Sequence, residues 1–372
     1  MSPLEPEVRF THQGQELIWR SESDAPAPAT LAPVDDRLDA EQALRRVRKG
    51  EHLLYEGDFR NAKQLLAAMG RRLDRGRAPK DQSLLELFRA ERFARLAEHE
   101  TLSRILVRLD PGYRPVGLKS APDVAAACAA VWGPARLPTV VPLKALIGML
   151  GAAEWYRKGL VVRGLPGKLH PHYGVFLPTR SEYVDLLLEA PAPTGKRVFD
   201  IGTGTGVLSF LLLQRGAVSA VGTDVDPRSV ACATENAERL GFAGRFEAQQ
   251  TELFPTGTAD LVISNPPWIP EPPKNRIDRA VFDENHHFLE GFLAGLSSHL
   301  AHDGEGWLLM SDLAELLGLR PPQFLPDQMA AAGLRVKWKK AAPARHSKAR
   351  DAEDPLHAAR SRELTTLYCL VR

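Results

Sequence analysis

The sequence predicts an α/β protein in which a mainly helical N-terminal part precedes a mostly parallel β-sheet covered by helices on both faces. Two observations predict this fold. From Lys196 onward, short and nearly continuous apolar runs alternate with longer segments of helical periodicity, which is typical of parallel strands joined by helices. From Asp36 to about Leu109, the apolar residues instead recur at helical spacing.

Length and composition describe a globular protein with more than one domain. The chain has 372 residues, of which 44% are hydrophobic and 25% charged, and one domain usually takes roughly 100–200 residues. No run approaches the ~18 consecutive apolar residues of a membrane span, and the N-terminus lacks the apolar core of a secretory signal. The three cysteines lie far apart, which argues against a disulfide framework or a thiolate metal site and predicts a cytoplasmic location.

Three segments are expected in order along the chain. Residues 1–35 should form a small hairpin followed by an Ala/Pro-rich linker. Residues 36–160 should form a helical substrate-binding or accessory domain, in which Asp58 is expected to be an N-cap and Ser83 with Glu86 a capping box. Residues 161–372 should form the α/β domain.

Two basic segments stand out against a net charge of only +2. Residues 45–80 form either a solvated helical face or a docking surface for RNA or an acidic protein. Residues 335–362 form either a solvated insert or a loop that contacts phosphates.

Two histidine pairs could supply metal ligands, but neither is expected to form a metal site. His170 and His172 lie in a proline-bounded loop without a third ligand nearby, so a structural or substrate-facing role is expected. His286 and His287 adjoin Asp283, and we expect polar residues at a helix start there. The sequence therefore predicts no metal.

The elements expected in the α/β domain alternate regularly until its end. The predicted helices are residues 181–189, 207–215, 227–240, 288–300 and 326–332, and the predicted strands are residues 198–201, 220–223, 245–249, 261–264, 306–311, 334–338 and 364–371. No helix is predicted between the last two strands, so they could pair directly as an antiparallel edge.

A glycine-rich turn follows the first of these strands. The strand ends at Asp200 and is followed by Gly202, Gly204 and Gly206 and then by a helix. Such glycines permit unusual backbone conformations and let a ligand lie against the main chain, at which the N–H groups of the helix point. The spacing differs from the G-x-G-x-x-G/A of dinucleotide sites, and a carboxylate at Asp200 suits a cationic group such as the amino group of a methionyl moiety.

An acidic residue ends the second strand. Asp224 lies 24 residues after Asp200, where it can accept hydrogen bonds from both hydroxyls of a ribose. The alternative, an N-cap for the next helix, suits Asp226 better. After the third strand, Thr251 and Glu252 could flank an adenine ring.

The fourth strand ends in the rigid tip Asn265-Pro266-Pro267-Trp268. The two prolines fix φ and remove two N–H donors. The Asn265 side-chain oxygen and the Pro266 carbonyl can then accept both hydrogen bonds of an –NH2 group, while Trp268 stacks on a planar group. This arrangement suits a planar amide or exocyclic amine whose nitrogen is aimed at an electrophile. The alternative is a rigid loop with an incidental Trp.

Together these motifs resemble class I S-adenosylmethionine-dependent methyltransferases, in the group that includes release-factor glutamine methyltransferases and ribosomal RNA guanine-N2 methyltransferases. The similarity runs from roughly Gly174 to Arg372, and Trp268 stands where Tyr or Phe is commoner. The resemblance implies a Rossmann-like, seven-stranded, mostly parallel sheet with an antiparallel last strand. It also implies S-adenosylmethionine as co-substrate, bound by Asp200, Gly202, Thr203, Gly204, Gly206, Asp224 and Glu252, and catalysis at Asn265, Pro266, Pro267 and Trp268.

The leading hypothesis is therefore an N-methyltransferase. Its acceptor is either a glutamine amide of a release-factor-like or ribosomal protein, or an exocyclic amine of RNA, guanine or adenine. One alternative is a non-catalytic RNA- or ribosome-binding protein on a methyltransferase scaffold. The other is a nicotinamide-dependent oxidoreductase, against which the glycine spacing and the Pro-Pro tip argue. The acceptor and the oligomeric state stay open.

Overall fold

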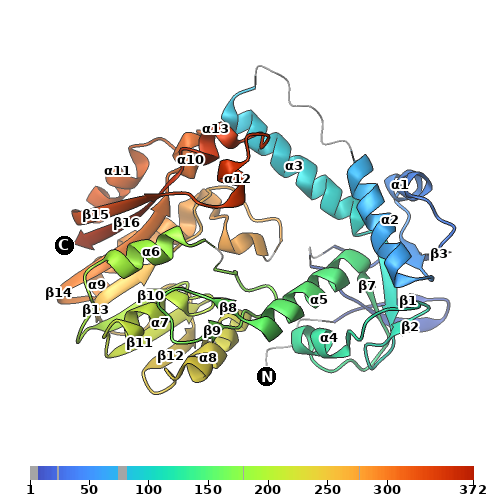
Figure 1. Cartoon of the computed structure of the whole chain (residues 1–372), viewed down its shortest axis with the longest axis horizontal. Coiled ribbons are helices and arrows are strands. Elements are labelled where there is room, and N and C mark those ends of the chain that lie inside the picture. Colours follow the sequence, from blue (N-terminus) through green and yellow to red (C-terminus); the bar gives the residue numbers. More distant parts are fainter. Residues whose placement is uncertain (1–6, 23–24, 74–81, 179, 276) are drawn as a thin grey trace. The chain divides into compact units, whose positions relative to one another are not determined.

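The structure is a computed structural model that describes residues 7–22, 25–73, 82–178, 180–275 and 277–372. The chain divides into two compact units (Figure 1). Unit 1 comprises Met1–Lys80 and Arg89–Glu154, and unit 2 comprises Asp81–Phe88 and Trp155–Arg372. Residues 74–80 of the predicted basic segment lie outside the described residues.

Unit 2 is built on a seven-stranded sheet with the order β12-β11-β10-β13-β14-β16-β15. The strands from β12 to β14 pair in parallel, whereas β16 runs antiparallel to both of its neighbours. This confirms the predicted sheet and its antiparallel edge. The strands are β10 (Arg197–Ile201), β11 (Ser219–Asp224), β12 (Phe246–Gln250), β13 (Ala259–Ser264), β14 (Leu300–Ser311), β15 (Arg335–Pro343) and β16 (Leu364–Val371).

The helices of unit 2 cover both faces of this sheet. They are α6 (Glu182–Glu189), α7 (Val207–Gln214), α8 (Pro227–Leu240), α9 (His287–His299), α10 (Leu313–Leu316), α11 (Phe324–Ala331), α12 (Ser347–Arg350) and α13 (His357–Arg360), with 3-10 turns η1 (Ile277–Ala280) and η2 (Glu284–His286). A short strand pair, β8 (Leu160–Val161) and β9 (Lys168–Leu169), precedes them.

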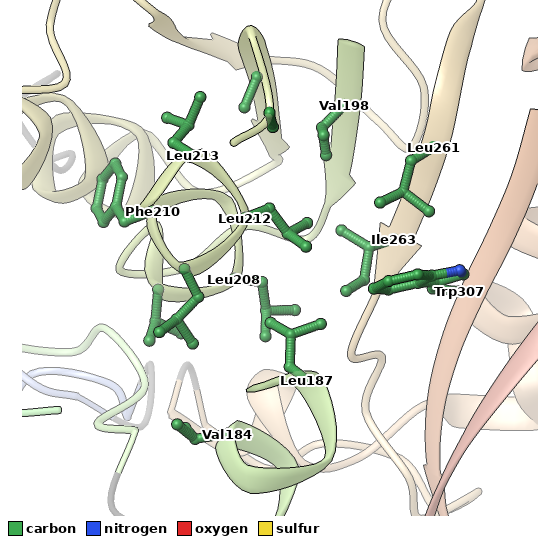
Figure 2. Packing of buried hydrophobic residues seen from close by; sticks show 14 of the residues in the cluster. Val184, Leu187, Val198, Leu208, Phe210, Leu212, Leu213, Leu261, Ile263 and Trp307 are labelled. Atoms are coloured by element: carbon green, nitrogen blue, oxygen red, sulfur yellow. The ribbon is translucent and has the colours of Figure 1, made fainter. Parts of the chain in front are cut away.

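Successive strand residues pack into separate cores on the two faces. Val198 of β10 packs with the helices α6, α7 and α8, whereas the next residue, Phe199, packs with α9 and α11. Figure 2 shows Val198 on the first face, together with Leu212 of α7 and Trp307 of β14. The residues Val207 to Leu213 of α7 are all buried, so this helix is buried on every side and lies within the core.

The strand register brings the predicted motifs to one edge of the sheet. Asp200 of β10 lies opposite Gly222 of β11 and Ile263 of β13, and the three strands run in parallel. Their carboxyl ends therefore meet. Because β10 lies between β11 and β13, the strand order reverses at this point, where open α/β sheets bind ligands.

Unit 1 contains the predicted helices and also a sheet that was not predicted. Its strand order is β1-β2-β7-β5-β4-β3, with β6 beside β5. The strands are β1 (Val8–His12), β2 (Gln15–Trp19), β3 (Ala32–Val34), β4 (Leu53–Tyr55), β5 (Ile105–Leu109), β6 (Pro115–Val116) and β7 (Thr139–Pro142). The helices are α1 (Ala40–Arg48), α2 (Phe59–Arg72), α3 (Leu84–Leu102), α4 (Ala125–Trp132) and α5 (Leu143–Lys158), of which α3 and α5 extend across the boundary between the units.

The predicted description of residues 1–160 was therefore incomplete. The hairpin β1–β2 and both caps are present: Asp58 caps α2, and Ser83 and Glu86 exchange hydrogen bonds. However, residues 1–35 are not a separate segment, because β2 pairs with β7 and β3 lies within the predicted linker and pairs with β4. Strands of two to five residues are too short for a clear periodicity, and their pairing is long-range.

Candidate functional site

The glycine turn after β10 requires its glycines. The φ angles of Gly202, Gly204 and Gly206 are +76°, +54° and +84°, in the region that other residues avoid. The amides of Gly202 and Thr203 both donate to the Thr223 carbonyl, at 2.9 and 2.8 Å, so the turn is tied to β11. A Cβ on Gly206 would lie 2.4 Å from the Phe210 ring, whereas one on Gly204 would face open space.

Asp200 is buried, and only one of its two carboxylate oxygens has hydrogen-bond partners. Its Oδ2 accepts hydrogen bonds from the hydroxyls of Thr203 and Ser209, each at 2.8 Å, and from the Ser209 amide at 3.2 Å. Its Oδ1 is buried without a hydrogen-bond partner. Burial raises the pKa of Asp200 to about 6, although the hydrogen bonds from Thr203 and Ser209 act in the opposite direction. The second oxygen is thus an unmet acceptor at the turn.

Ser209 is a site residue that sequence reasoning missed. It is the one polar residue in the run Val207 to Leu213, and it is fully buried. A lone hydroxyl in an apolar helix start, shortly after an acidic strand end, was the available signal. Through Ser209, Asp200 holds the first turn of α7 against β10.

Asp224 reaches across to the glycine turn from the end of β11. Its Oδ2 accepts the Gly204 amide at 3.1 Å, and its Oδ1 accepts the Asp226 amide at 2.9 Å. Burial raises the pKa of Asp224. Asp226 instead caps α8 by accepting the Arg228 amide at 2.9 Å, as the sequence indicated. Val225, the residue after Asp224, is 56% exposed and adds an apolar surface beside Asp224.

The Glu252 carboxylate lies on the surface of unit 2. The Glu252 side chain is 72% exposed, and its ion-pair partner is His287 at 3.4 Å. The Thr251 amide donates to the Asp224 carbonyl at 3.2 Å, so this segment lies beside the end of β11.

The Asn265–Trp268 tip lies directly beside the turn. The Ser264 hydroxyl donates to the Ile201 carbonyl at 2.8 Å, which joins the ends of β13 and β10. The Asn265 Oδ1 is buried without a hydrogen-bond partner. Trp268 is anchored by its indole N–H, which donates to the Leu309 carbonyl at 3.2 Å. The tip therefore presents a second unmet acceptor at the same edge of the sheet as that of Asp200.

The loop after the tip returns to the same edge of the sheet. Asp283 caps α9 by accepting the amides of Phe288 and Leu289, at 2.8 and 3.0 Å. Phe288, also missed in the sequence, packs so closely that a Cβ on Gly202 would lie 3.2 Å from its ring. His286 stacks on Phe324 with centroids 4.1 Å apart. Burial and then the Arg320 charge lower the pKa of His286 to about 4, so it is neutral at pH 7.

The histidines of the 164–180 loop hold that loop against α8. His172 Nε2 lies 2.7 Å from the Glu235 carboxylate, and the His170 amide donates to Asn236 at 2.8 Å. A Cβ on Gly174 would lie 2.6 Å from the Arg228 guanidinium, so this loop borders the end of β11. Within the described ranges, no group of three or more His, Cys, Asp or Glu residues could hold a metal ion.

Several cations of the basic segment 335–362 are paired with acidic side chains. The pairs are Lys337 with Glu305, Arg345 with Asp185, and Arg360 with Asp354. Among the helices that the structure describes, none is long and apolar enough to cross a membrane.

Part of this chain is similar to known methyltransferases. Residues 185–266 match the family model of ribosomal protein L11 methyltransferase (PrmA). A relative from Methanocaldococcus jannaschii, named "Putative protein N5-glutamine methyltransferase", is 31% identical over 160 residues, which cover 41% of this chain and 79% of the relative. A tRNA1(Val) (adenine(37)-N6)-methyltransferase from Pedobacter heparinus is 32% identical and covers 33% of this chain and 58% of the relative.

A solved structure is similar over about half of this chain. It is the SAM-dependent methyltransferase from Thiobacillus denitrificans in complex with S-adenosyl-L-homocysteine, at 16% identity and a TM-score of 0.36, covering 53% of this chain and 92% of that one.

The chain belongs to the S-adenosylmethionine-dependent methyltransferases, and it is an enzyme that takes S-adenosylmethionine as co-substrate. Two of these relatives are named after an acceptor nitrogen, N5 of glutamine or N6 of adenine. The prediction of an S-adenosylmethionine-dependent methyltransferase is therefore confirmed.

Proposed function

We propose that this enzyme methylates the side-chain amide nitrogen of a glutamine in a protein substrate. The observation that carries the chemistry is the buried, unpartnered Oδ1 of Asn265 at the carboxyl end of β13. An unpaired buried acceptor costs about 1–3 kcal/mol, and the –NH2 group of an acceptor would remove that cost. The choice of glutamine rests on the glutamine-methyltransferase relative from Methanocaldococcus jannaschii, of which this chain covers 79%.

The cofactor side of the site fits S-adenosylmethionine. The unpartnered Asp200 Oδ1 suits the methionyl ammonium, and the open space at Gly204 lets the ligand lie against the turn formed by residues 202–206. Asp224 stands at the end of β11, where its carboxylate can accept the ribose hydroxyls. When bound, the co-substrate supplies an electrophilic methyl group on a sulfonium.

On the acceptor side, the protein would orient a weak nucleophile. The Asn265 Oδ1 and the Pro266 carbonyl accept the two N–H bonds of the amide, which lets the nitrogen lone pair turn toward the methyl group. Pro266 and Pro267 keep these acceptors in place because their φ angles are fixed. The nitrogen can lose its proton after it is alkylated, so no strong general base is required.

The test is transfer of a labelled methyl group from S-adenosylmethionine into a cell extract that is then separated into protein, RNA and DNA. We expect label in protein, and acid hydrolysis should release methylamine from the methylated amide. Label in RNA would instead assign the acceptor to a nucleobase amine, in line with the tRNA-modifying relative.

Asn265→Ala tests the mechanism itself. This variant should still bind S-adenosylmethionine but lose methyl transfer, because only the acceptor side is changed. Gln323→Ala, which removes an exposed amide far along the chain, is the control and should behave as the wild type. Unchanged turnover in Asn265→Ala would refute the role of the tip.

A further inference from the structure

The Trp268 ring is held in a way that the methyl-transfer scheme does not explain. Its indole N–H donates to the Leu309 carbonyl at 3.2 Å, and the Arg180 guanidinium carbon lies 4.7 Å from the ring centroid. A guanidinium at this distance over an indole face is attracted to it. Both the edge and one face of the ring are therefore occupied by the protein.

Arg180 is itself fixed by two buried carboxylates. Its Nε donates to Glu182 at the start of α6, and a terminal nitrogen donates to Glu363 Oε1 at 2.8 Å. The Glu182 and Glu363 side chains are both buried, and that of Arg180 is only 18% exposed. A planar guanidinium with donors in a fixed fork can bridge two carboxylates in this way, which a lysine cannot.

Glu363 is in turn fully engaged. Its Oε1 also accepts the Ser311 hydroxyl at 2.6 Å, and its Oε2 lies 3.2 Å from His346 Nε2. Because His346 Nδ1 accepts the Ala349 amide, its Nε2 carries the N–H that donates a hydrogen bond to Glu363. The carboxylate therefore stays in one place, between the end of β14 and the start of β16.

We propose that Arg180 is a positioning residue for methyl transfer, which holds the Trp268 ring and through it the acceptor tip. This inference rests on the proposed role of Asn265. Pro266 and Pro267 join the two residues, and because both have a fixed φ, a shift of Trp268 is passed on to Asn265. A misplacement of about 1 Å in a reacting pair can cost roughly 100-fold in rate.

A simpler role for Arg180 would be to attach α6 to the sheet. Arg345 offers a matched control, since it forms an ion pair at 2.7 Å with Asp185 of the same helix and is 49% exposed. Arg345→Ala removes an ion pair of α6 but leaves Arg180 and Trp268 unchanged.

Kinetics separate the two roles. In Arg180→Ala we expect kcat to fall by up to about 100-fold, with the affinity for S-adenosylmethionine unchanged. Arg180→Lys should recover part of kcat, because a cation remains over the ring. Arg345→Ala should match the wild type. A wild-type kcat in Arg180→Ala would overturn the proposal, as would an equal loss in Arg345→Ala.

A readout without turnover tests the contact directly. The protein has six tryptophans, so labelling with 5-fluorotryptophan gives a small set of fluorine NMR signals, and Trp268→Phe identifies the signal of Trp268. This signal should shift and broaden in Arg180→Ala, while that of the buried Trp307 should not change. An unchanged Trp268 signal would overturn the proposal. If the wild type transfers no methyl group, the proposed function fails, and the NMR result still decides whether Arg180 holds Trp268.

Discussion

Lowering the pH from 7 to 5 is expected to weaken the binding of S-adenosylmethionine about tenfold, through protonation of Asp200. The Asp200 Oδ1 is the buried acceptor proposed for the methionyl ammonium, and it has no partner within the protein. Burial first, and less strongly the Asp224 charge, raise the pKa of Asp200 to about 6. A pH change in the mildly acidic range therefore removes the charge that the ammonium would bind.

The magnitude follows from that pKa. When only the ionised carboxylate binds the ligand, protonation multiplies the apparent Kd by 1 + 10^(pKa − pH). With a pKa of about 6, this factor is about 1.1 at pH 7 and about 11 at pH 5, a ratio of roughly ten.

The raised pKa of Asp200 has the opposite effect on the ligand-free protein, whose stability it increases at low pH. The pKa in the fold is about 6, above the ordinary value of 3.8, so folding favours the protonated carboxyl. This contribution to stability is complete below pH 3.8 and is lost as the pH rises through about 6. The difference between the two pKa values corresponds to about 3 kcal/mol of unfolding free energy. Asp200→Asn should remove this pH-dependent contribution to stability.

The assay is calorimetric titration of S-adenosylmethionine at pH 5, 6 and 7. Asp200→Asn should bind weakly at every pH and show no tenfold change, because its amide does not titrate. Asp224→Asn should be measured alongside, since burial also raises the pKa of Asp224. Asp226→Asn, which alters the cap of α8 and the ion pair with Arg228, is the control. Equal affinity of the wild type at pH 5 and 7 would refute the assignment of the ammonium to Asp200.

Four further substitutions test the site and its support. Gly204→Ala should fold with about 1–2 kcal/mol of backbone strain but lose S-adenosylmethionine binding. Gly206→Ala should lower the melting temperature further, because its Cβ would lie 2.4 Å from the Phe210 ring. Thermal melts and ligand titrations distinguish the two variants. Asp224→Ala should weaken binding by about 2 kcal/mol, roughly 30-fold, through the lost charged hydrogen bonds to ribose, and titration with adenosine should show the same loss. Leu212→Ala removes a fully buried side chain of α7 and should lower the unfolding free energy by about 2–5 kcal/mol, measured by urea unfolding; a smaller change would contradict the tight packing in Figure 2.

The sequence by itself determined the sheet of unit 2 and the positions of Asp200, the glycine turn, Asp224 and the Asn265 tip. These features are local, because strand and helix periods, glycines with positive φ and consecutive prolines act within a few residues. Parallel strands then had to bring the motifs to one edge, which the register of β10 with β11 and β13 confirms.

Only the tertiary structure decided which groups complete this edge. The Arg180–Trp268 and Arg180–Glu363 contacts join residues 88 and 183 positions apart, and Glu252 pairs with the distant His287. In unit 1, Ile18 pairs with Thr139, which no local pattern indicates. Hydrogen bonds and ring contacts require only closeness in space, so side chains far apart in sequence leave no periodic signal until the chain has folded.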